Sequence, residues 1–260
     1  MIELAVHKLR KFLEHKLHVD CSVTFHMDTA FLVSDQIPFD ICVYTPDLMR
    51  DLPSPRRKTI YLSETQVAHQ FTKICNRIKV LSGAAEVIFA RQTVCARVDK
   101  KVSVDFLDEH HIQIPLSGKY RYGLFLNGEL VSLAVFSGGR QMSDKRPGYR
   151  SFELIRFCHK GDLLIVGGLS KLIAKFIAEF DPDDIMTYVD LNWAQQSSLT
   201  EIDFTEVGRL PESYTWISGR RQFPVSNSIA FRQILESHPD GYLIHSRGSI
   251  KMLKYLHKAL

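Results

Sequence analysis

The strongest constraint on the fold is a hairpin signal at Asn127-Gly128. In YRYGLFLNGELVSLAVFSG, an apolar stretch rich in strand-forming residues lies on each side of this dipeptide. Asn-Gly favours the type I′ turn, because both central residues of that turn need a positive φ. The sequence therefore predicts two antiparallel strands joined by a two-residue turn.

A strand, a helix and another strand are expected after the hairpin. SFELIRFCH, residues 151–159, has apolar residues on both faces, as a central strand does. LLIVGGLSKLIAKFIAEFDP, residues 163–182, passes through two glycines into a helix pattern with Ser170 as its expected N-cap. DIMTYVDLNW, residues 184–193, predicts the next strand. The apolar stripe that predicts a helix packed on a sheet is Leu172, Ile173, Phe176, Ile177 and Phe180.

Two regions are expected, with the boundary near residue 90. Residues 1–90 predict a small α/β unit with an N-terminal helix, several short strands and a helix that stops at Gly83. Residues 91–260 hold the hairpin, the β-α-β pattern and a C-terminal extension. An antiparallel start and a parallel continuation predict a mixed sheet, and hence the α/β (α+β) fold class.

Three further segments are each expected to form a single element or a connection. VIFARQTVCARV, residues 87–98, alternates like one strand, and KKVSVDFLDEHH, residues 100–111, predicts a short helix ending at a His pair. AQQSSLTEIDFTEVG, residues 194–208, predicts a polar connection before the strand SYTWIS.

Composition excludes several protein classes. The chain has 260 residues, of which 45% are hydrophobic, so it can bury a core without disulfides. No run approaches the roughly 20 apolar residues of a membrane span, and the N-terminus lacks a signal-peptide pattern. The five cysteines are widely spaced, with no C-x-x-C pair. We therefore expect a cytoplasmic protein with no structural metal and no membrane partner.

Basic loops suggest nucleic acid as a partner. The formal net charge is only +4, but SPRRK, GGRQMSDKRPGYR and SGRRQF each cluster Arg or Lys in an expected loop. Such loops can follow a phosphate backbone, and they can equally be ordinary solvated surface. The sequence gives no indication of the oligomeric state.

The glycine junction at residues 166–171 has two interpretations. Free N–H groups at a helix start bind anions, whereas glycines before a helix can also form nothing more than a tight turn. The P-loop pattern and the dinucleotide pattern G-x-G-x-x-G are both absent.

The order hairpin, long strand, glycine turn, helix and strand resembles the core of the GNAT acyltransferases. In that family a pattern [RQ]-x-x-G-x-[GA] at this turn binds the pyrophosphate of acyl-coenzyme A. Here Gly168 matches the central glycine, while Ile165 and Ser170 depart from the pattern. The resemblance implies acetyl-coenzyme A or another acyl-coenzyme A as cofactor, held by residues 166–171. These residues are Val166, Gly167, Gly168, Leu169, Ser170 and Lys171.

Residues 88 to 260 also resemble a GNAT-like domain found at the C-terminal end of phage homing-endonuclease-like proteins. The blocks YGLFLNGELVSLAVF, FELIRFC, VGGLSKL, YVDLNW and GYLIHSRGSIK carry this resemblance. That domain is distantly similar to Mom-type DNA-modifying enzymes. The resemblance implies that residues 1–90 are a reduced nuclease-like remnant, although no D…E-x-K metal constellation is present there.

Transfer of an acyl group to an amine needs a proton acceptor, an oriented amine and a polarised carbonyl. The expected catalytic candidates are Asp190, Glu109, His111 and Tyr214. The expected substrate-binding candidates are Tyr122, Arg156 and Trp193. Each has a structural alternative, namely a helix cap or surface position for the histidine, core packing for the aromatics, and an Arg156–Asp190 ion pair.

Two functions therefore stand side by side. The first is direct transfer of an acyl or related group from a coenzyme A donor to an amine, with nucleic acid as a candidate carrier of that amine. The second is a non-catalytic nucleic-acid-binding module derived from a mobile-element endonuclease.

Overall fold

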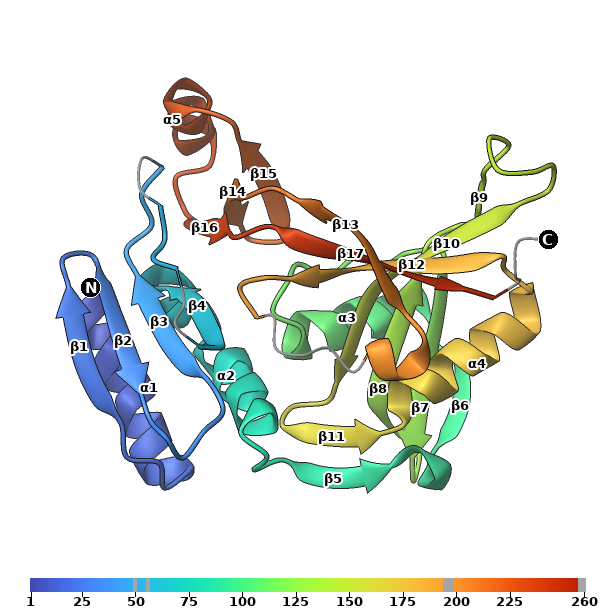
Figure 1. Ribbon diagram of the computed structural model, residues 1–260, viewed down its shortest axis with the longest axis horizontal. Coiled ribbons are helices and arrows are strands. Elements are labelled where there is room, and N and C mark those ends of the chain that lie inside the picture. Colours follow the sequence, from blue (N-terminus) through green and yellow to red (C-terminus); the bar gives the residue numbers. More distant parts are fainter. Residues whose placement is uncertain (49–50, 55–56, 194–198, 257–260) are drawn as a thin grey trace. The chain divides into compact units, whose positions relative to one another are not determined.

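The computed structural model describes residues 1–48, 51–54, 57–193 and 199–256, whose elements are labelled in Figure 1. The chain forms two compact units. Unit 1 comprises residues 1–84, 189–197 and 209–250, and unit 2 comprises residues 85–188, 198–208 and 251–260. Three strands have residues in both units: β12 (Asp184–Asp190), β13 (Thr205–Leu210) and β17 (Ser249–Tyr255). The predicted domains 1–90 and 91–260 stay a prediction.

Unit 1 begins with a four-stranded sheet and two helices. Its elements are α1 (Ile2–Lys16), β1 (Ser22–His26), β2 (Thr29–Val33), β3 (Asp40–Tyr44), β4 (Thr59–Ser63) and α2 (Glu64–Leu81). The strand order is β1-β2-β3-β4, antiparallel as far as β3 and parallel from β3 to β4. Leu9 and Leu13 of α1 are fully buried, as expected for a helix with one apolar face.

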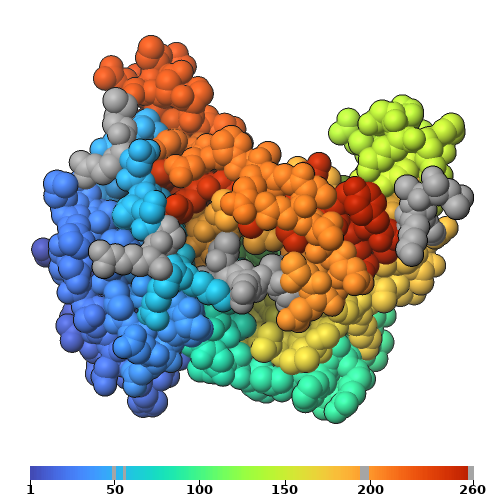
Figure 2. Space-filling model, viewed as in Figure 1, coloured from blue at the N-terminus to red at the C-terminus, as the bar shows by residue number. Residues whose placement is uncertain are grey.

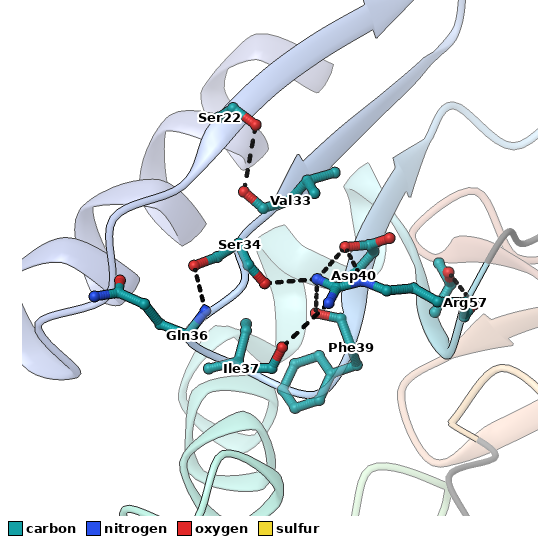
Figure 3. Close-up of polar contacts among 9 residues, drawn as sticks. Ser22, Val33, Ser34, Gln36, Ile37, Phe39, Asp40 and Arg57 are labelled. Carbon is teal, nitrogen blue, oxygen red and sulfur yellow. Dashed lines mark hydrogen bonds and ion pairs between the residues drawn. The ribbon is translucent and has the colours of Figure 1, made fainter.

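Arg57 anchors the connection between β2 and β3, as Figure 3 shows. Its guanidinium pairs with the Asp40 carboxylate at 2.6 Å and donates to the carbonyl oxygens of Ser34 and Phe39. Arg57 of the expected basic loop SPRRK is therefore paired within the protein. Residues 55–56 of that loop lie outside the described residues.

The later part of unit 1 is a three-stranded sheet with a helix. Its elements are β14 (Ser213–Ser218), β15 (Arg221–Val225), α5 (Ser228–Ser237) and β16 (Tyr242–Ser246), in the order β15-β14-β16. The prediction that SGRRQF is a loop is wrong for Arg221–Phe223. These residues pair with Trp216–Ser218, because Gly219 has a φ of +55° and closes a hairpin.

Unit 2 is built around a mixed sheet with the strand order β13-β17-β12-β10-β8-β7-β6, with β9 paired to β10. Its strands are β5 (Glu86–Phe89), β6 (Val94–Arg97), β7 (Tyr120–Leu126), β8 (Glu129–Phe136), β9 (Arg140–Gln141), β10 (Arg150–His159) and β11 (Leu163–Val166). Its helices are α3 (Lys100–His110) and α4 (Gly168–Phe180), with short 3₁₀ turns at Ala90–Gln92 and Thr200–Ile202.

The topology confirms the main predictions. Asn127 and Gly128 have φ values of +50° and +85°, and they join β7 to β8 as the predicted type I′ hairpin. β10 lies between β8, to which it is antiparallel, and β12, to which it is parallel across α4. This order is the one that the GNAT resemblance implies, so the α/β class with a GNAT-like mixed sheet is confirmed.

An aromatic cluster joins α4 to one face of this sheet. The ring of Phe176 stacks on Phe136 with centroids 4.0 Å apart, and Phe152 meets it edge-on at 5.2 Å. Phe176 and Phe136 are both fully buried. Such packing fixes the helix against β8 and β10.

Two element predictions need correction. Residues 87–98 form two short strands, β5 and β6, because a 3₁₀ turn interrupts them and the Thr93 hydroxyl donates to the Ala90 carbonyl. β5 then pairs in parallel with β11 in a separate two-stranded sheet. The polar segment 194–208 contains the start of β13, while its residues 194–198 lie outside the described part.

Among the described residues, no helix is long and apolar enough to cross a membrane.

Candidate functional site

The two parallel strands β10 and β12 separate after a short stretch of pairing. Only three pairs join them, from Ser151 with Asp184 to Glu153 with Met186. Immediately afterwards, the Thr187 hydroxyl donates to the Leu154 carbonyl at 2.8 Å, and the register of β10 against β8 shifts between Leu154 and Arg156. The C-terminal half of β10 therefore pairs with β8 alone within the described ladders. Where a strand separates from its neighbour, its N–H and C=O groups on that side can pair with an extended ligand.

The turn before α4 exposes main-chain donors. Gly167 is the N-cap and has a φ of +74°, a conformation that glycine adopts without strain. The helix begins at Gly168, so the prediction of Ser170 as N-cap is wrong; the left-handed glycine already ends the turn, and Ser170 lies in the first helical turn. The first N–H groups of any helix have no intrahelical acceptor, and the helix dipole adds positive potential there.

The side chains around this turn supply little charge. Ile165 occupies the place of the basic or amide residue in the family pattern and is only 2% exposed. Lys171 donates to the carbonyl oxygens of Ala90 and Thr93, so its ammonium is held by the 3₁₀ turn. Val166 and the nearby Phe89 are exposed, and they are paired neighbours on β11 and β5. The turn therefore fits an anion through main-chain N–H groups, beside an apolar surface.

A pocket of about 420 Å³ lies on the paired part of β10 and β12. Its walls come from the end of β8, the β9 segment, β10, β12 and β17. In Figure 2 the yellow-green β9 segment lies beside the red end of β17, and Lys145 approaches the Tyr255 ring to 5.5 Å. The charged or aromatic lining residues are Arg140, Lys145, Phe152, Glu153, Asp184, Tyr188 and Lys251.

Asp184 organises one wall of this pocket. Its side chain is 1% exposed and accepts hydrogen bonds from the Tyr149 hydroxyl at 2.6 Å, the Lys145 ammonium at 3.2 Å and the Ser151 hydroxyl. A buried carboxylate needs such partners to offset the loss of water. Both carboxylate oxygens of Asp184 therefore already accept hydrogen bonds, and through Lys145 and Tyr149 they hold the β9 segment, residues 138–149, against the sheet.

The predicted candidates in α3 lie near its end. Glu109 has a side chain that is 76% exposed, and its carboxylate is 3.8 Å from His110. His111 is the C-cap residue, and its Nδ1 accepts a hydrogen bond from the Gln113 N–H at 3.0 Å. This is the capping alternative, and the catalytic role of both residues stays a prediction.

Tyr122 and Arg156 have partners inside unit 2. The buried Tyr122 hydroxyl donates to Glu179 at 2.5 Å, and Glu179 also pairs with Arg97. Arg156 donates to the carbonyl oxygens of Ile114 at 3.1 Å and Ile155 at 2.8 Å, and burial lowers the pKa of its guanidinium. Their predicted contact with substrate stays untested.

Asp190, Trp193 and Tyr214 belong to unit 1. Asp190 accepts from the Asn192 N–H at 2.9 Å, and the Arg77 guanidinium lies 5.1 Å from the centre of the buried Trp193 ring. Tyr214 stacks on His245 at 4.3 Å, and burial raises the pKa of its hydroxyl. A raised pKa keeps Tyr214 protonated, so it can donate a hydrogen bond but is a poor base at neutral pH.

Several solved structures with similar folds are acetyltransferases. The histone acetyltransferase HPA2 and related acetyltransferase from Corynebacterium glutamicum matches 65% of this chain and 99% of its own, at 13% identity and a TM-score of 0.40. The ribosomal-protein-S18-alanine N-acetyltransferase from Escherichia coli matches 65% of this chain and 96% of its own, at 13% identity and a TM-score of 0.40. A GNAT family acetyltransferase from Elizabethkingia anophelis, with acetyl-CoA bound, matches 64% and 99% at 9% identity and a TM-score of 0.34.

No protein-family model and no curated protein matches the chain.

Glu153 is the functional candidate that the sequence analysis did not identify. It lies in the last pair before β10 and β12 separate, and it lines the pocket. A carboxylate inside the apolar strand SFELIRFCH was the available signal, comparable to that of Arg156. Within the described residues, no group of three or more His, Cys, Asp or Glu side chains is placed to hold a metal ion.

Proposed function

We propose that the protein transfers an acyl group from a coenzyme A thioester to an amine. The observation that carries this proposal is the separation of β10 from β12 directly beyond the pocket that contains Glu153. A donor with amide groups can bind along β10 beyond Glu153 in the manner of a strand, because β10 no longer pairs with β12 there and a strand edge has alternating N–H and C=O groups. The acyl end of this donor then lies toward the pair of Glu153 and Met186, the last pair between β10 and β12.

The turn before α4 suits the phosphate end of such a donor. The N–H groups of Gly168, Leu169 and Ser170 are the first of a 13-residue helix, and Gly167 and Ser170 are exposed. Helix starts with accessible N–H groups bind phosphates. The exposed Phe89 and Val166 beside the turn provide an apolar surface for the nucleotide base.

Glu153 is positioned to accept the proton of the attacking amine. A bound acyl-coenzyme A supplies a thioester whose carbonyl carbon forms a bond to the amine nitrogen while its carbon–sulfur bond breaks. The amine proton passes to the Glu153 carboxylate and then to water, and the sulfur leaves as a thiolate that water protonates. General-base catalysis of this kind requires the carboxylate within hydrogen-bond reach of the amine, and the position of Glu153 in the pocket lining supports this role.

Calorimetry with coenzyme A and acetyl-coenzyme A tests the donor site. We expect saturable binding at ligand concentrations up to about 1 mM. Ser170→Asp should weaken it by about tenfold, because a carboxylate at the helix start repels the pyrophosphate. Ser170→Asn has nearly the same shape without the charge and should bind like the wild type. Asp in the first turn of a helix is stabilising, so misfolding would not explain a loss.

Absence of binding by the wild type, or equal affinity of Ser170→Asp and Ser170→Asn, would overturn this proposal. If the wild type binds neither ligand but still binds nucleic acid, the non-catalytic binding module becomes the better description.

A further inference from the structure

In the pocket on β10 and β12, more cationic than anionic side chains can contact a ligand. Three cationic side chains line it, and one of them, Lys145, is already paired with Asp184. Within the described part of the chain, the side chains of Arg140 and Lys251 make no ion pair or hydrogen bond with the protein. Arg140 is exposed and Lys251 is half-buried. Both cations are therefore available to an anion that enters the pocket.

The negative side of the pocket is a single available carboxylate. Asp184 is buried and already accepts three hydrogen bonds, whereas Glu153 is half-buried and lines the pocket without a side-chain hydrogen bond among the described residues. One carboxylate opposite two free cations matches a ligand that has both an amine and a doubly charged anion. A phosphate monoester has a charge of about −1.5 to −2 at neutral pH.

The remaining lining determines the size and organic character of the ligand. Met142, Met186 and Leu253 contribute apolar surface, and the Tyr188 ring is 38% exposed. A volume of about 420 Å³ falls within the range of small-molecule sites, roughly 300–1,000 Å³. An exposed tyrosine ring beside methionines can pack against a flat or apolar ligand body.

We propose that this pocket binds the acceptor, and that the acceptor is an amine carrying a phosphate monoester, no larger than a nucleotide. This inference rests on the proposed function for the direction of the amine toward Glu153. Arg140 and Lys251 bind the phosphate, and the guanidinium of Arg140 can do so with two parallel hydrogen bonds. Asp184 keeps the β9 segment, and with it Arg140, over the pocket.

Binding to the full chain without any acyl donor tests the pocket separately from the donor site. The probes are 2-aminoethyl phosphate and AMP, and their uncharged counterparts are 2-aminoethanol and adenosine. We expect the phosphorylated member of at least one pair to bind at least tenfold more tightly than its counterpart, and its affinity to fall as salt rises. Binding of AMP but not of 2-aminoethyl phosphate would indicate that the ligand is a nucleotide. Binding of a single-stranded oligonucleotide, measured next, then shows whether the pocket accepts free or polymeric nucleotides.

Variants identify the residues responsible. Lys251→Gln and Arg140→Gln should each weaken the phosphorylated probe about tenfold and leave the uncharged counterpart unchanged. Lys175→Gln removes an exposed cation of α4 that does not line the pocket, and it should bind like the wild type. Equal affinity for charged and uncharged probes, no binding of any probe, or equal loss in Lys175→Gln would overturn the inference. Coenzyme A binding that survives in these variants separates such a failure from failure of the donor site.

Discussion

The central strands of unit 2 have one face that packs against α4 and one face that lines the proposed acceptor pocket. On one face, Phe152 joins Phe136 and Phe176 in an aromatic cluster under α4. On the other, Glu153 of β10 and Asp184 of β12 line a charged pocket, which Phe152 also borders. Alternation along a strand turns neighbouring residues to opposite faces, so one short segment supplies both. The two faces should therefore fail in different ways when they are altered.

The largest effect is expected on the packed face. Phe176→Ala should lower the free energy of unfolding by about 3–5 kcal/mol, because it empties a fully buried site between aromatic rings. Denaturant unfolding measures this loss. Lys175→Ala on the same helix is the control and should change stability by less than about 0.5 kcal/mol. A loss below about 1 kcal/mol in Phe176→Ala would mean that α4 is not fixed by this cluster.

A smaller loss of stability, with a larger loss of binding, is expected on the pocket face. Asp184→Asn should cost about 2 kcal/mol, since an amide NH₂ replaces an acceptor that faces three donors. The β9 segment then loses its attachment, and affinity for the phosphorylated probe should fall while α4 stays packed. Near-UV circular dichroism and probe titration measure the two effects. If the affinity for the phosphorylated probe were unchanged, Asp184 would not be needed for binding in this pocket.

The smallest effect concerns pH and the ion pair at the border of the packed face. The Tyr122 hydroxyl and then Arg97 lower the pKa of Glu179 below its ordinary 4.5. A lowered pKa contributes stability above pH 4.5 that is lost as pH falls through the folded value. Glu179→Gln should therefore have a lower melting temperature than the wild type at pH 6, and the difference should narrow toward pH 3. Glu109→Gln, which removes a carboxylate that is 76% exposed, is the control. A difference that is constant with pH would assign the effect to packing instead.

The sequence was sufficient to predict those elements whose structure depends on neighbouring residues alone. Asn127-Gly128 fixes its hairpin because the two residues themselves accept positive φ, and the apolar stripe of α4 depends only on helical spacing. The N-cap of α4 was mispredicted for a similar local reason. Both Gly167 and Ser170 suit the start of a helix, and the left-handed backbone at Gly167 decides between them.

The pocket could not be predicted, since its residues come from segments that are far apart in the chain. Glu153 and Lys251 are separated by nearly one hundred residues, and only the strand order β17-β12-β10 brings them to one surface. Periodicity identifies strands but does not give their order in a sheet. For the same reason the sequence could not show that Asp184 already accepts three hydrogen bonds while Glu153 is available.

The three-pair ladder between β10 and β12 has a consequence for hydrogen exchange. Main-chain amides in a strand exchange slowly where both neighbours hold them and faster where one side is open to water. Ser151 pairs with both β12 and β9, and Glu153 pairs with β12 and is hydrogen-bonded to Ser137, whereas Arg156 to His159 pair with β8 alone among the described ladders. The second half of β10 can therefore report on binding: a ligand that accepts hydrogen bonds along this edge would slow the exchange of the alternate amides that point toward it and leave those that face β8 unchanged.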